Sequence, residues 1–248
     1  MGIQINVGLM AYGMSGKVFH APFVHLNDGF NFVAVTERST KQVEKDYPDV
    51  KSYDTIEELI ADENIDLIII NTPNYTHYEY AKKCLQAGKH ILVEKPFTAT
   101  VAQAKELFAL ANEKGKKALV YQNRRFDSGF KLTKEVIDSG KLGKLTEVHF
   151  RYDRYRNEIG PKVFKEDSAY EASGLQYDLG PHLLDQAIAL FGKPTKVSKT
   201  LARYRKNSKV DDYFFIHLSY PNQVNVYLTS TMLAADIPPA FVVNGMMG

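Results

Sequence analysis

Apolar runs that alternate with helix-like segments fill the first half of this chain. Five of these runs are short and rich in β-branched residues: IQINVGL, FNFVAVTE, DLIIINTP, HILVEK and KALVYQN. VKSY around Tyr53 is a weaker candidate for a sixth strand. Several are apolar almost throughout, which is typical of parallel strands covered on both faces. The intervening segments carry helix start and stop signals, such as a capping box expected at Asp54 and Glu57. This alternation predicts an α/β fold with a doubly wound parallel (Rossmann) sheet over residues 1–125.

The second half of the chain carries longer strand-like runs and fewer helices. Helices are expected near residues 130–139 and 178–191, and strands are expected in KLTEVHFRYDRY, TKVSKTLARYRK, DDYFFIHLSY and QVNVYLTSTM. Short connections such as Pro221-Asn222 between these runs predict antiparallel hairpins. We therefore expect residues 126–248 to form an α+β domain for substrate binding and oligomerisation, with an open, mostly antiparallel sheet.

The last nine residues, AFVVNGMMG, have the pattern of a strand that opens into an Asn-Gly turn with nothing after it to pair. A long apolar sheet edge tends to recruit another chain. A homo-oligomer formed through the second-domain sheet, or aggregation there, is the expected consequence.

Composition narrows the class of protein further. The 248 residues are 44% hydrophobic and 24% charged with a net charge of +2, so neither a nucleic-acid partner nor an anionic membrane is expected. The alternating FRYDRYR run fits the two faces of a strand, either solvated or on the substrate side. Cys84 is the one cysteine, which excludes an intramolecular disulfide and agrees with a reducing, cytoplasmic location. No apolar run approaches the roughly 18–20 residues of a membrane span, and the first ten residues do not resemble a signal peptide.

The glycine-containing loop AYGMSGKV follows the first predicted strand and matches two nucleotide-binding patterns incompletely. A triphosphate-binding loop requires Ser or Thr after the lysine, where this chain has Val18. The dinucleotide pattern G-x-G-x-x-G loses only its first glycine, at Ala11, and keeps Gly13 and Gly16. The sequence therefore favours a dinucleotide over ATP. The expected cofactor-binding residues of the loop are Ala11, Tyr12, Gly13, Met14, Ser15 and Gly16.

A candidate partner for the cofactor's ribose lies at the end of the second strand. Glu37 comes 21 residues after Gly16, close to the spacing of about 20 that dinucleotide sites show. A carboxylate there accepts hydrogen bonds from the 2′-hydroxyl of NAD, whereas the guanidinium of the adjacent Arg38 can hold the 2′-phosphate of NADP. Arg38 could equally be a plain surface charge. The pair leaves the choice between NAD and NADP open.

Polar residues follow three of the predicted strands at the edge of the sheet where ligands bind. Lys95 ends the run HILVEK and precedes Pro96, so its amine is expected to project into the cofactor crevice. It could hydrogen-bond a substrate hydroxyl there. The alternative is a lysine that merely extends into solvent from a strand end.

A second polar cluster lies in LQYDLGPHLLDQ. Asp178, His182 and Asp185 would share one face of a continuous helix, and a carboxylate beside an imidazole suits a general base for an alcohol proton. Pro181 complicates this, because either the helix begins near Gly180 with Asp178 outside it, or the helix bends. A hydrogen-bonded core or capping role for His182 is the alternative. No metal is expected, since no third nitrogen or thiolate ligand lies nearby.

Taken together, these segments resemble the Gfo/Idh/MocA family of NAD(P)-dependent oxidoreductases over nearly the whole chain. The resemblance rests on AYGMSGKVFHAPF, TPNYTHYEYAKKCLQAGKHILVEKPFT, YQNRRFD and YDLGPHLLDQ. SGKVFHAPF, NRR and RYRNE are most similar to the NADP-using scyllo-inositol dehydrogenase branch. Two features depart from the family pattern: Ala11 replaces a glycine, and the chain ends at Gly248, where relatives continue with further strands and a closing helix. The resemblance therefore implies that the second domain is incomplete at its C-terminal end.

The resemblance implies roles for individual residues. It implies that Lys95, Asp178 and His182 are catalytic and bind substrate, with His182 as proton acceptor and Lys95 on the same hydroxyl. It places Tyr155 and neighbouring basic residues near the substrate as well. Further cofactor contacts are implied at Thr72, Pro73, His77, Glu94 and Asn123.

The implied activity is hydride transfer between NAD or NADP, with NADP favoured, and a secondary alcohol of an inositol, polyol or sugar. The alternative is a non-catalytic, NAD(P)-sensing regulatory protein of the same fold. Retention of lysine, aspartate and histidine together favours the enzyme, because a sensor requires none of them.

Overall fold

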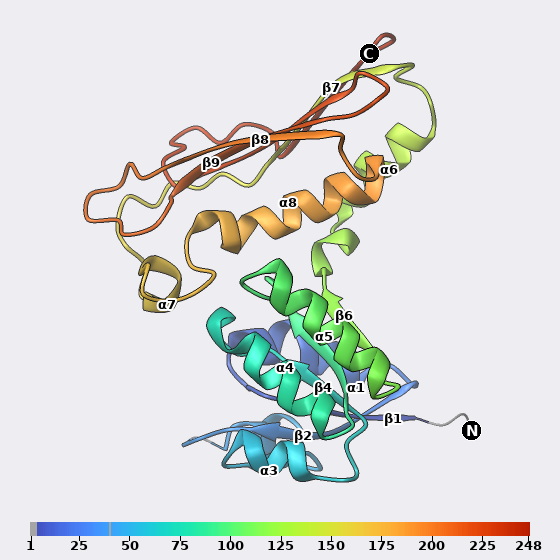
Figure 1. Cartoon of the computed structure of the whole chain (residues 1–248), viewed down its shortest axis with the longest axis vertical. Helices are drawn as coiled ribbons and strands as arrows, with labels where there is room; N and C mark the ends of the chain where they lie inside the picture. Colours follow the sequence, from blue (N-terminus) through green and yellow to red (C-terminus); the bar gives the residue numbers. More distant parts are fainter. Residues whose placement is uncertain (1–3, 40) are drawn as a thin grey trace. The chain divides into compact units, whose positions relative to one another are not determined.

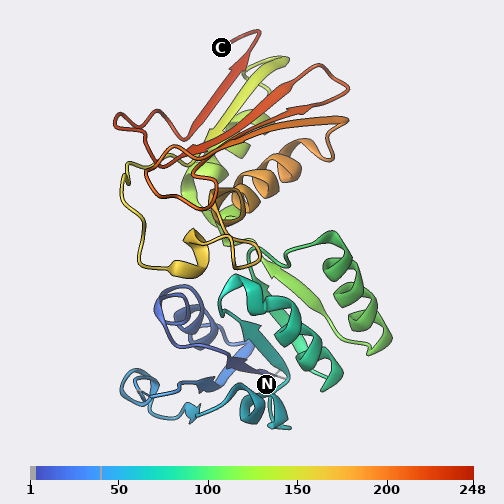
Figure 2. The same cartoon turned by 60° about the vertical axis from the view of Figure 1, so that its left-hand side comes forward.

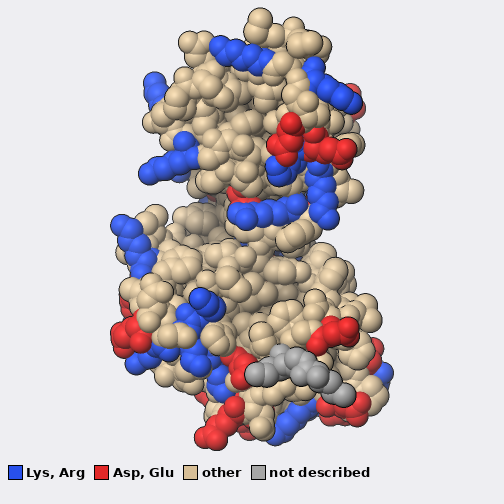
Figure 3. Space-filling model, turned by 90° about the vertical axis from the view of Figure 1, so that its right-hand side faces the viewer, with Lys and Arg blue, Asp and Glu red and all other residues tan. Residues whose placement is uncertain are grey.

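The computed structural model describes residues 4–39 and 41–248. By its internal contacts the chain forms two compact units, one ending at Tyr121 and the other beginning at Gln122 (Figures 1 and 2). The domain limits expected from the sequence, 1–125 and 126–248, differ from this division by residues 122–125. These residues include most of the short helix η3 (Asn123–Phe126), whose Arg124 carbonyl accepts a hydrogen bond from Gln186 of the second unit. Basic and acidic side chains are interspersed over the face drawn in Figure 3, in keeping with the net charge of +2.

The first unit is built on a parallel sheet of six strands, as the alternating pattern predicts. The strand order is β3-β2-β1-β4-β5-β6, so the order reverses between β1 and β4. This reversal is the point at which doubly wound sheets bind ligands, beyond the carboxyl ends of the strands. The strands are β1 (Ile5–Leu9), β2 (Phe30–Thr36), β3 (Lys51–Tyr53), β4 (Leu67–Ile70), β5 (His90–Glu94) and β6 (Ala118–Tyr121).

Helices cover both faces of this sheet, which explains why its strands are apolar almost throughout. On one face Ile68, Ile70 and Ile91 pack with Leu85 of α4 and Leu107 of α5. On the other face, strand residues pack against α1 and α2. The helical segments are η1 (Gly16–His20), α1 (Ala21–His25), α2 (Val43–Asp46), α3 (Ile56–Ala61), η2 (Asn74–Thr76), α4 (His77–Gln86) and α5 (Val101–Glu113).

The capping box expected at Asp54 and Glu57 is displaced by one residue. Thr55 is the N-cap of α3, and its hydroxyl accepts a hydrogen bond from the backbone N–H of Glu58. The Glu58 carboxylate in turn accepts from the N–H groups of Thr55 and Asp54. The sequence expectation was wrong because Thr55 and Glu58 have the same three-residue spacing as the pair that was chosen.

The second unit is an α+β layer with a mixed, mostly antiparallel sheet, as expected. Its strand order is β11-β7-β10-β9-β8, and only the β7–β10 pair is parallel. Helices α6 and α8 lie along one face of this sheet (Figure 1). The elements are α6 (Ser128–Asp138), β7 (Leu145–Arg151), α7 (Val163–Glu166), α8 (Leu175–Phe191), β8 (Lys196–Ala202), β9 (Tyr213–Ser219), β10 (Asn225–Thr231) and β11 (Phe241–Gly245).

The core of the second unit forms between α8 and the inward side of the sheet. Residues of β9 alternate between buried and half-buried, which is the period-2 pattern of a strand with one covered face. Phe150, Phe214 and Leu228 of the sheet pack with Leu179 and Leu183 of α8. Because these contacts lie along the whole helix, they fix the face that α8 turns away from the sheet.

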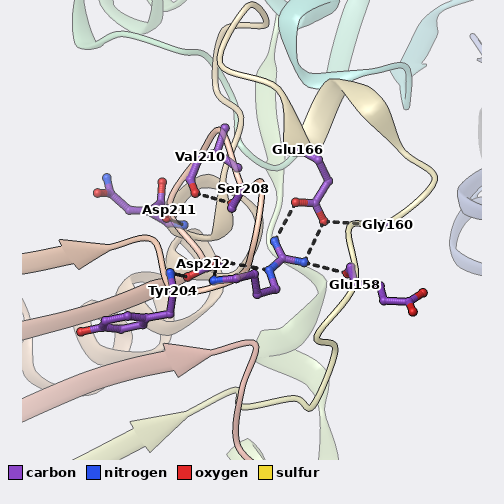
Figure 4. Close-up of polar contacts among 10 residues, drawn as sticks. Glu158, Gly160, Glu166, Tyr204, Ser208, Val210, Asp211 and Asp212 are labelled. Atoms are coloured by element: carbon purple, nitrogen blue, oxygen red, sulfur yellow. Dashed lines mark hydrogen bonds and ion pairs between the residues drawn. The ribbon is translucent and has the colours of Figure 1, made fainter.

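A buried arginine joins the β8–β9 connection to α7 (Figure 4). The guanidinium of Arg205 donates to the Glu166 carboxylate at 2.7 Å, to Asp212 at 3.3 Å and to the backbone oxygen of Glu158 at 3.0 Å. Asp212 also accepts from the backbone N–H groups of Tyr204 and Arg205. The Arg205 and Asp212 side chains are 2% and 0% exposed, so water cannot replace either partner. This network holds α7 in place.

Arg205→Ala should lower the free energy of unfolding of the second unit by about 3–5 kcal/mol, because it leaves the buried Asp212 carboxylate without its cation. Urea unfolding followed by circular dichroism measures this. Lys209→Ala is the matched control, since its ion pair with Asp167 is exposed and contributes little. Equal losses for the two variants would contradict a structural role for the Arg205 network.

Candidate active site

The loop after β1 is fixed by a side chain from the neighbouring strand β4. Asn71 directly follows β4, and its amide oxygen accepts a hydrogen bond from the Ala11 N–H at 2.9 Å. Its amide nitrogen donates to the Ala11 carbonyl at 2.8 Å. Asn71 therefore satisfies both backbone groups of the residue that replaces the first glycine. Sequence reasoning missed this role of Asn71.

Glu94, at the end of β5, connects the glycine loop to Lys95. One carboxylate oxygen accepts from the Ser15 hydroxyl at 2.9 Å and lies 2.9 Å from the His20 imidazole. The other oxygen accepts from the backbone N–H of Lys95 at 3.2 Å. Burial raises the pKa of the Glu94 carboxyl, but the hydrogen bonds from His20 and Ser15 outweigh burial and the net pKa is lowered. Glu94 is thus an ionised acceptor on which the loop and the strand end converge.

His20 and Tyr121 were missed by sequence reasoning. His20 is buried in η1, and its ring lies 4.3 Å from the ring of Tyr121 at the end of β6. The Tyr121 hydroxyl donates to the Phe19 carbonyl at 2.6 Å. These contacts hold the imidazole against Glu94. The segment SGKVFHAPF contained His20, but no spacing rule in the sequence indicated that its partner would be Glu94.

His77 joins the ends of β4 and β5. Its two ring nitrogens lie 2.8 Å from the Pro96 carbonyl oxygen and 3.0 Å from the Thr72 carbonyl oxygen. Burial lowers the pKa of His77, although both carbonyls favour the charged form. Lys95 directly precedes Pro96 and is half-buried, and the peptide bond between them is cis. His77 therefore positions the segment that carries Lys95.

The Thr72 side chain also lies within this turn. Its hydroxyl lies 2.7 Å from the hydroxyl of Thr76, which donates to the carbonyl of Pro73. Thr72 and Pro73 are half-buried. The nicotinamide contacts implied for Thr72, Pro73 and His77 stay predictions.

The structure gives Glu37 and Arg38 different surroundings. Glu37 is buried, and its carboxylate accepts from the backbone N–H groups of Gln42 and Val43 at 2.9 and 3.1 Å and from the Ser52 hydroxyl at 3.2 Å. It thereby satisfies backbone donors at the start of α2. Arg38 is exposed beside it. The ribose contact expected of Glu37 stays a prediction, and its carboxylate already has these three donors.

Helix α8 continues through Pro181, so the alternative in which the helix begins near Gly180 is wrong. It begins at Leu175 and ends at Phe191, and the Asp178 N–H donates to the Gly174 carbonyl at 3.0 Å. Asp178 and His182 therefore lie one turn apart on the same side of one helix. The ring of His182 lies 6.3 Å from that of Tyr152, and His182 is 5% exposed.

The polar residues around Asp178 and His182 were only partly anticipated. Lys165 of α7 was not anticipated, and its ammonium lies 2.5 Å from the Asp178 carboxylate. Asp185 lies three residues after His182 in the continuous helix, as expected, and accepts two hydrogen bonds of 2.6 Å from the guanidinium of Arg125 in η3. Tyr155 is 60% exposed.

The predicted site residues are therefore distributed over both units. The glycine loop, Glu37, Arg38, Thr72, Pro73, His77, Glu94 and Lys95 belong to the first unit, and Asn123, Tyr155, Asp178 and His182 belong to the second. Among residues 4–39 and 41–248, no group of three or more His, Cys, Asp or Glu side chains could hold a metal ion. No helix in the described part of the chain is long and apolar enough to cross a membrane.

Two family models together match most of the chain. Residues 5–122 match the oxidoreductase family with an NAD-binding Rossmann fold, and residues 130–248 match the GFO/IDH/MocA C-terminal domain. The first unit is thus an NAD-binding Rossmann domain, and either NAD or NADP fits the family.

Relatives support the same assignment. The oxidoreductase YdgJ of Escherichia coli is 42% identical over 100% of this chain and 71% of its own length. The scyllo-inositol 2-dehydrogenase (NADP(+)) IolW of Bacillus subtilis is 36% identical over 94% of this chain and 65% of its own length. The solved structure of the oxidoreductase YPO2259 of Yersinia pestis is 40% identical with a TM-score of 0.90, covering 99% of this chain and 69% of that one. The chain spans about two thirds of the length of these relatives. It belongs to the GFO/IDH/MocA family of oxidoreductases.

Proposed function

We propose that this oxidoreductase transfers a hydride between NAD(P) and a secondary alcohol of an inositol, polyol or sugar. The observation that carries the proposal is the unbroken helix α8, which places Asp178 and His182 one turn apart. Two relatives agree with it by their names: scyllo-inositol 2-dehydrogenase (NADP(+)) at 36% identity, and the inositol 2-dehydrogenase of Salmonella agona at 27% identity over 56% of its length.

His182 is the proposed proton acceptor. A neutral imidazole takes a hydroxyl proton near neutral pH, and a carboxylate one helical turn away stabilises the imidazolium that forms. Lys165 neutralises part of the Asp178 charge at 2.5 Å and holds that carboxylate in one orientation. Lys95 is proposed to hydrogen-bond the same substrate hydroxyl. Its backbone is fixed by Glu94, and the turn around it is fixed by His77.

The glycine loop fits a dinucleotide. A Cβ added to Gly13 would meet no atom within 4 Å, so the space in front of this residue is available for a pyrophosphate. A Cβ added to Gly16 would lie 2.3 Å from the Ala11 carbonyl oxygen, so the loop and η1 pack too closely for any side chain. When bound, the nicotinamide accepts or donates the hydride. The polypeptide supplies orientation and proton transfer.

We propose NADP as the preferred cofactor. The Glu37 carboxylate is engaged by backbone donors of α2, whereas the exposed Arg38 is available for a 2′-phosphate. A guanidinium binds a phosphate through two parallel hydrogen bonds, which a hydroxyl cannot match.

No observation favours the alternative of a non-catalytic NAD(P)-sensing protein. A cytoplasmic location and a homo-oligomer formed through the second-domain sheet stay predictions from the sequence.

The test of the activity is to follow absorbance of reduced nicotinamide with a panel of inositols, polyols and sugars. If the protein turns over no compound of the panel with either NAD or NADP, the proposal is contradicted.

Gly13→Ala and Gly16→Ala should separate cofactor binding from folding. Gly13→Ala should leave the melting temperature nearly unchanged, because its backbone is outside the left-handed region and the space is open. It should weaken NADPH binding about tenfold or more, since the methyl group occupies the cofactor's place. Gly16→Ala should lose binding and also about 1–3 kcal/mol of stability through overpacking. Thermal melts and fluorescence titration with NADPH measure both effects, and unchanged NADPH affinity in Gly13→Ala would exclude this loop as the pyrophosphate site.

Lys95→Ala and His182→Ala should each lower kcat about 10²–10⁴-fold, the usual contribution of a positioned proton-transfer group. NADPH affinity should be nearly intact in both variants. Steady-state kinetics on a substrate identified by the panel, together with NADPH titration, provide the measurement. Lys105→Ala, at an exposed position of α5, is the control for removal of a lysine. Near-normal kcat in both active-site variants would show that the catalytic assignment is wrong.

Arg38→Ala should weaken NADP binding by about 1.5–3 kcal/mol, roughly 10–150-fold, through loss of a charge-assisted contact. NAD binding should change little. Calorimetric titration with both cofactors measures the difference, and Lys45→Ala in the nearby helix α2 controls for loss of positive charge. Small and equal effects of Arg38→Ala on both cofactors would exclude Arg38 from the 2′-phosphate site.

A further inference from the structure

The last residue of η1 is a buried histidine that the proposed chemistry does not use. The His20 side chain is 1% exposed, and its Nε2 atom lies 2.9 Å from a carboxylate oxygen of Glu94. The same oxygen accepts from the Ser15 hydroxyl at 2.9 Å, and the other oxygen accepts from the backbone N–H of Lys95 at 3.2 Å. One carboxylate therefore joins His20 to the backbone of the proposed catalytic lysine.

The turn that carries His20 has an uncommon geometry. It is a π-helical turn, in which the Ala21 N–H donates to the Gly16 carbonyl five residues earlier. Such turns are rare in proteins and occur frequently at functional sites. The turn begins at Gly16, which packs closely against the Ala11 carbonyl of the glycine loop, and it ends at His20. It therefore connects the expected cofactor loop directly to the histidine.

Strand pairing in the parallel sheet fixes the surroundings of the imidazole. Glu94 at the end of β5 lies directly opposite Tyr121 at the end of β6. The centroids of the Tyr121 and His20 rings are 4.3 Å apart, and the Tyr121 hydroxyl donates to the Phe19 carbonyl at 2.6 Å. The imidazole is thus held against two neighbouring strand ends, with Nε2 directed at the carboxylate.

The ionisation of Glu94 depends on this contact. Burial raises the pKa of the Glu94 carboxyl, and the hydrogen bond from His20 is the largest of the effects that lower it. The ammonium of Lys95 also lowers the pKa of Glu94. His77 and Tyr121 lie within electrostatic range of the carboxylate, but burial lowers the pKa of His77 and raises that of Tyr121, so both are neutral near neutral pH. Loss of the His20 hydrogen bond should therefore raise the pKa of Glu94.

We infer that His20 is a positioning residue for Lys95, because its Nε2 atom holds the Glu94 carboxylate that binds the lysine backbone. This inference rests on the proposed function, which gives Lys95 its role in the reaction. A displacement of about 1 Å at a reacting group costs up to about 100-fold in rate. Loss of the Nε2 contact should therefore slow the reaction. NADPH binding should persist, because Ser15 of the glycine loop keeps its own hydrogen bond to Glu94.

Two substitutions of equal polarity separate the Nε2 contact from packing. Glutamine places its amide nitrogen close to the position of Nε2 of histidine, whereas asparagine places it close to Nδ1. In the full chain, His20→Asn should lower kcat about 10–100-fold on a substrate that the panel identifies, whereas His20→Gln should recover most of kcat. NADPH affinity should change by less than about threefold in both variants. His25→Asn, at an exposed position of the adjacent helix α1, is the control for removal of a histidine.

The pH dependence adds a readout that loss of packing alone would not change. The ratio of kcat in His20→Asn to kcat in the unsubstituted chain should fall as the pH is lowered. The reason is that Glu94 takes up a proton in the variant at a pH where it stays ionised in the unsubstituted chain. A protonated carboxyl holds the backbone N–H of Lys95 less strongly.

A nuclear magnetic resonance titration tests the same contacts without turnover. The amide proton shift of Lys95 should stay constant from about pH 7 to about pH 5 in the unsubstituted chain and in His20→Gln, and it should move over that range in His20→Asn. Equal kcat in the two His20 variants, or a Lys95 resonance that does not distinguish them, overturns the inference and leaves the proposed function standing. If the unsubstituted chain turns over no compound, the proposed function is contradicted, and a titration that distinguishes the variants still supports the positioning of Lys95 by His20.

Discussion

Burial of the parallel sheet on both faces is the constraint on which the first unit depends. Because helices cover Ile68, Ile70 and Ile91 from one side and other strand residues from the opposite side, polar groups are confined to the strand ends. The loops there must satisfy their own backbone groups. Asn71 does so for Ala11, and His77 does so for the turns after β4 and β5. The polar side chains at this edge therefore serve structure and the site together.

In the second unit, ion pairs hold the proposed site residues in position. Arg205 fixes α7 through Glu166, and the adjacent Lys165 meets the carboxylate of Asp178. The packing of α8 on the sheet sets the orientation of that helix, so Asp178 has one geometry available. A substitution in the β8–β9 connection can thus reach the proposed catalytic helix without touching it, through two ion pairs in series.

Local patterns in the sequence were sufficient to predict the main strands and helices. They were insufficient to predict which side chains would contact one another. Apolar runs of strand length correctly predicted the doubly wound sheet. Motifs of adjacent residues led to Lys95 and His182, whose catalytic roles stay predictions. Contacts such as Ala11 with Asn71 and His20 with Glu94 join residues 60 and 74 positions apart. They depend on which strands become neighbours, and no short-range spacing encodes that. Lys165 and Asp178 are only 13 positions apart, but their pairing depends on how α7 and α8 approach each other, which no spacing rule predicts.

Helix α8 shows why a local rule failed at the candidate site. Pro181 removes one backbone hydrogen bond and costs about 3 kcal/mol in a helix interior, and Gly180 adds about 1 kcal/mol. Leu175, Leu179 and Leu183 of the same helix are buried at 3% exposure or less, and each contributes roughly 1.5–3 kcal/mol on burial. Their burial exceeds the cost, so the helix continues. A chain selected for stability alone would have a better helix former than Gly180-Pro181 between Asp178 and His182, and such unfavourable local choices concentrate where function sets the sequence.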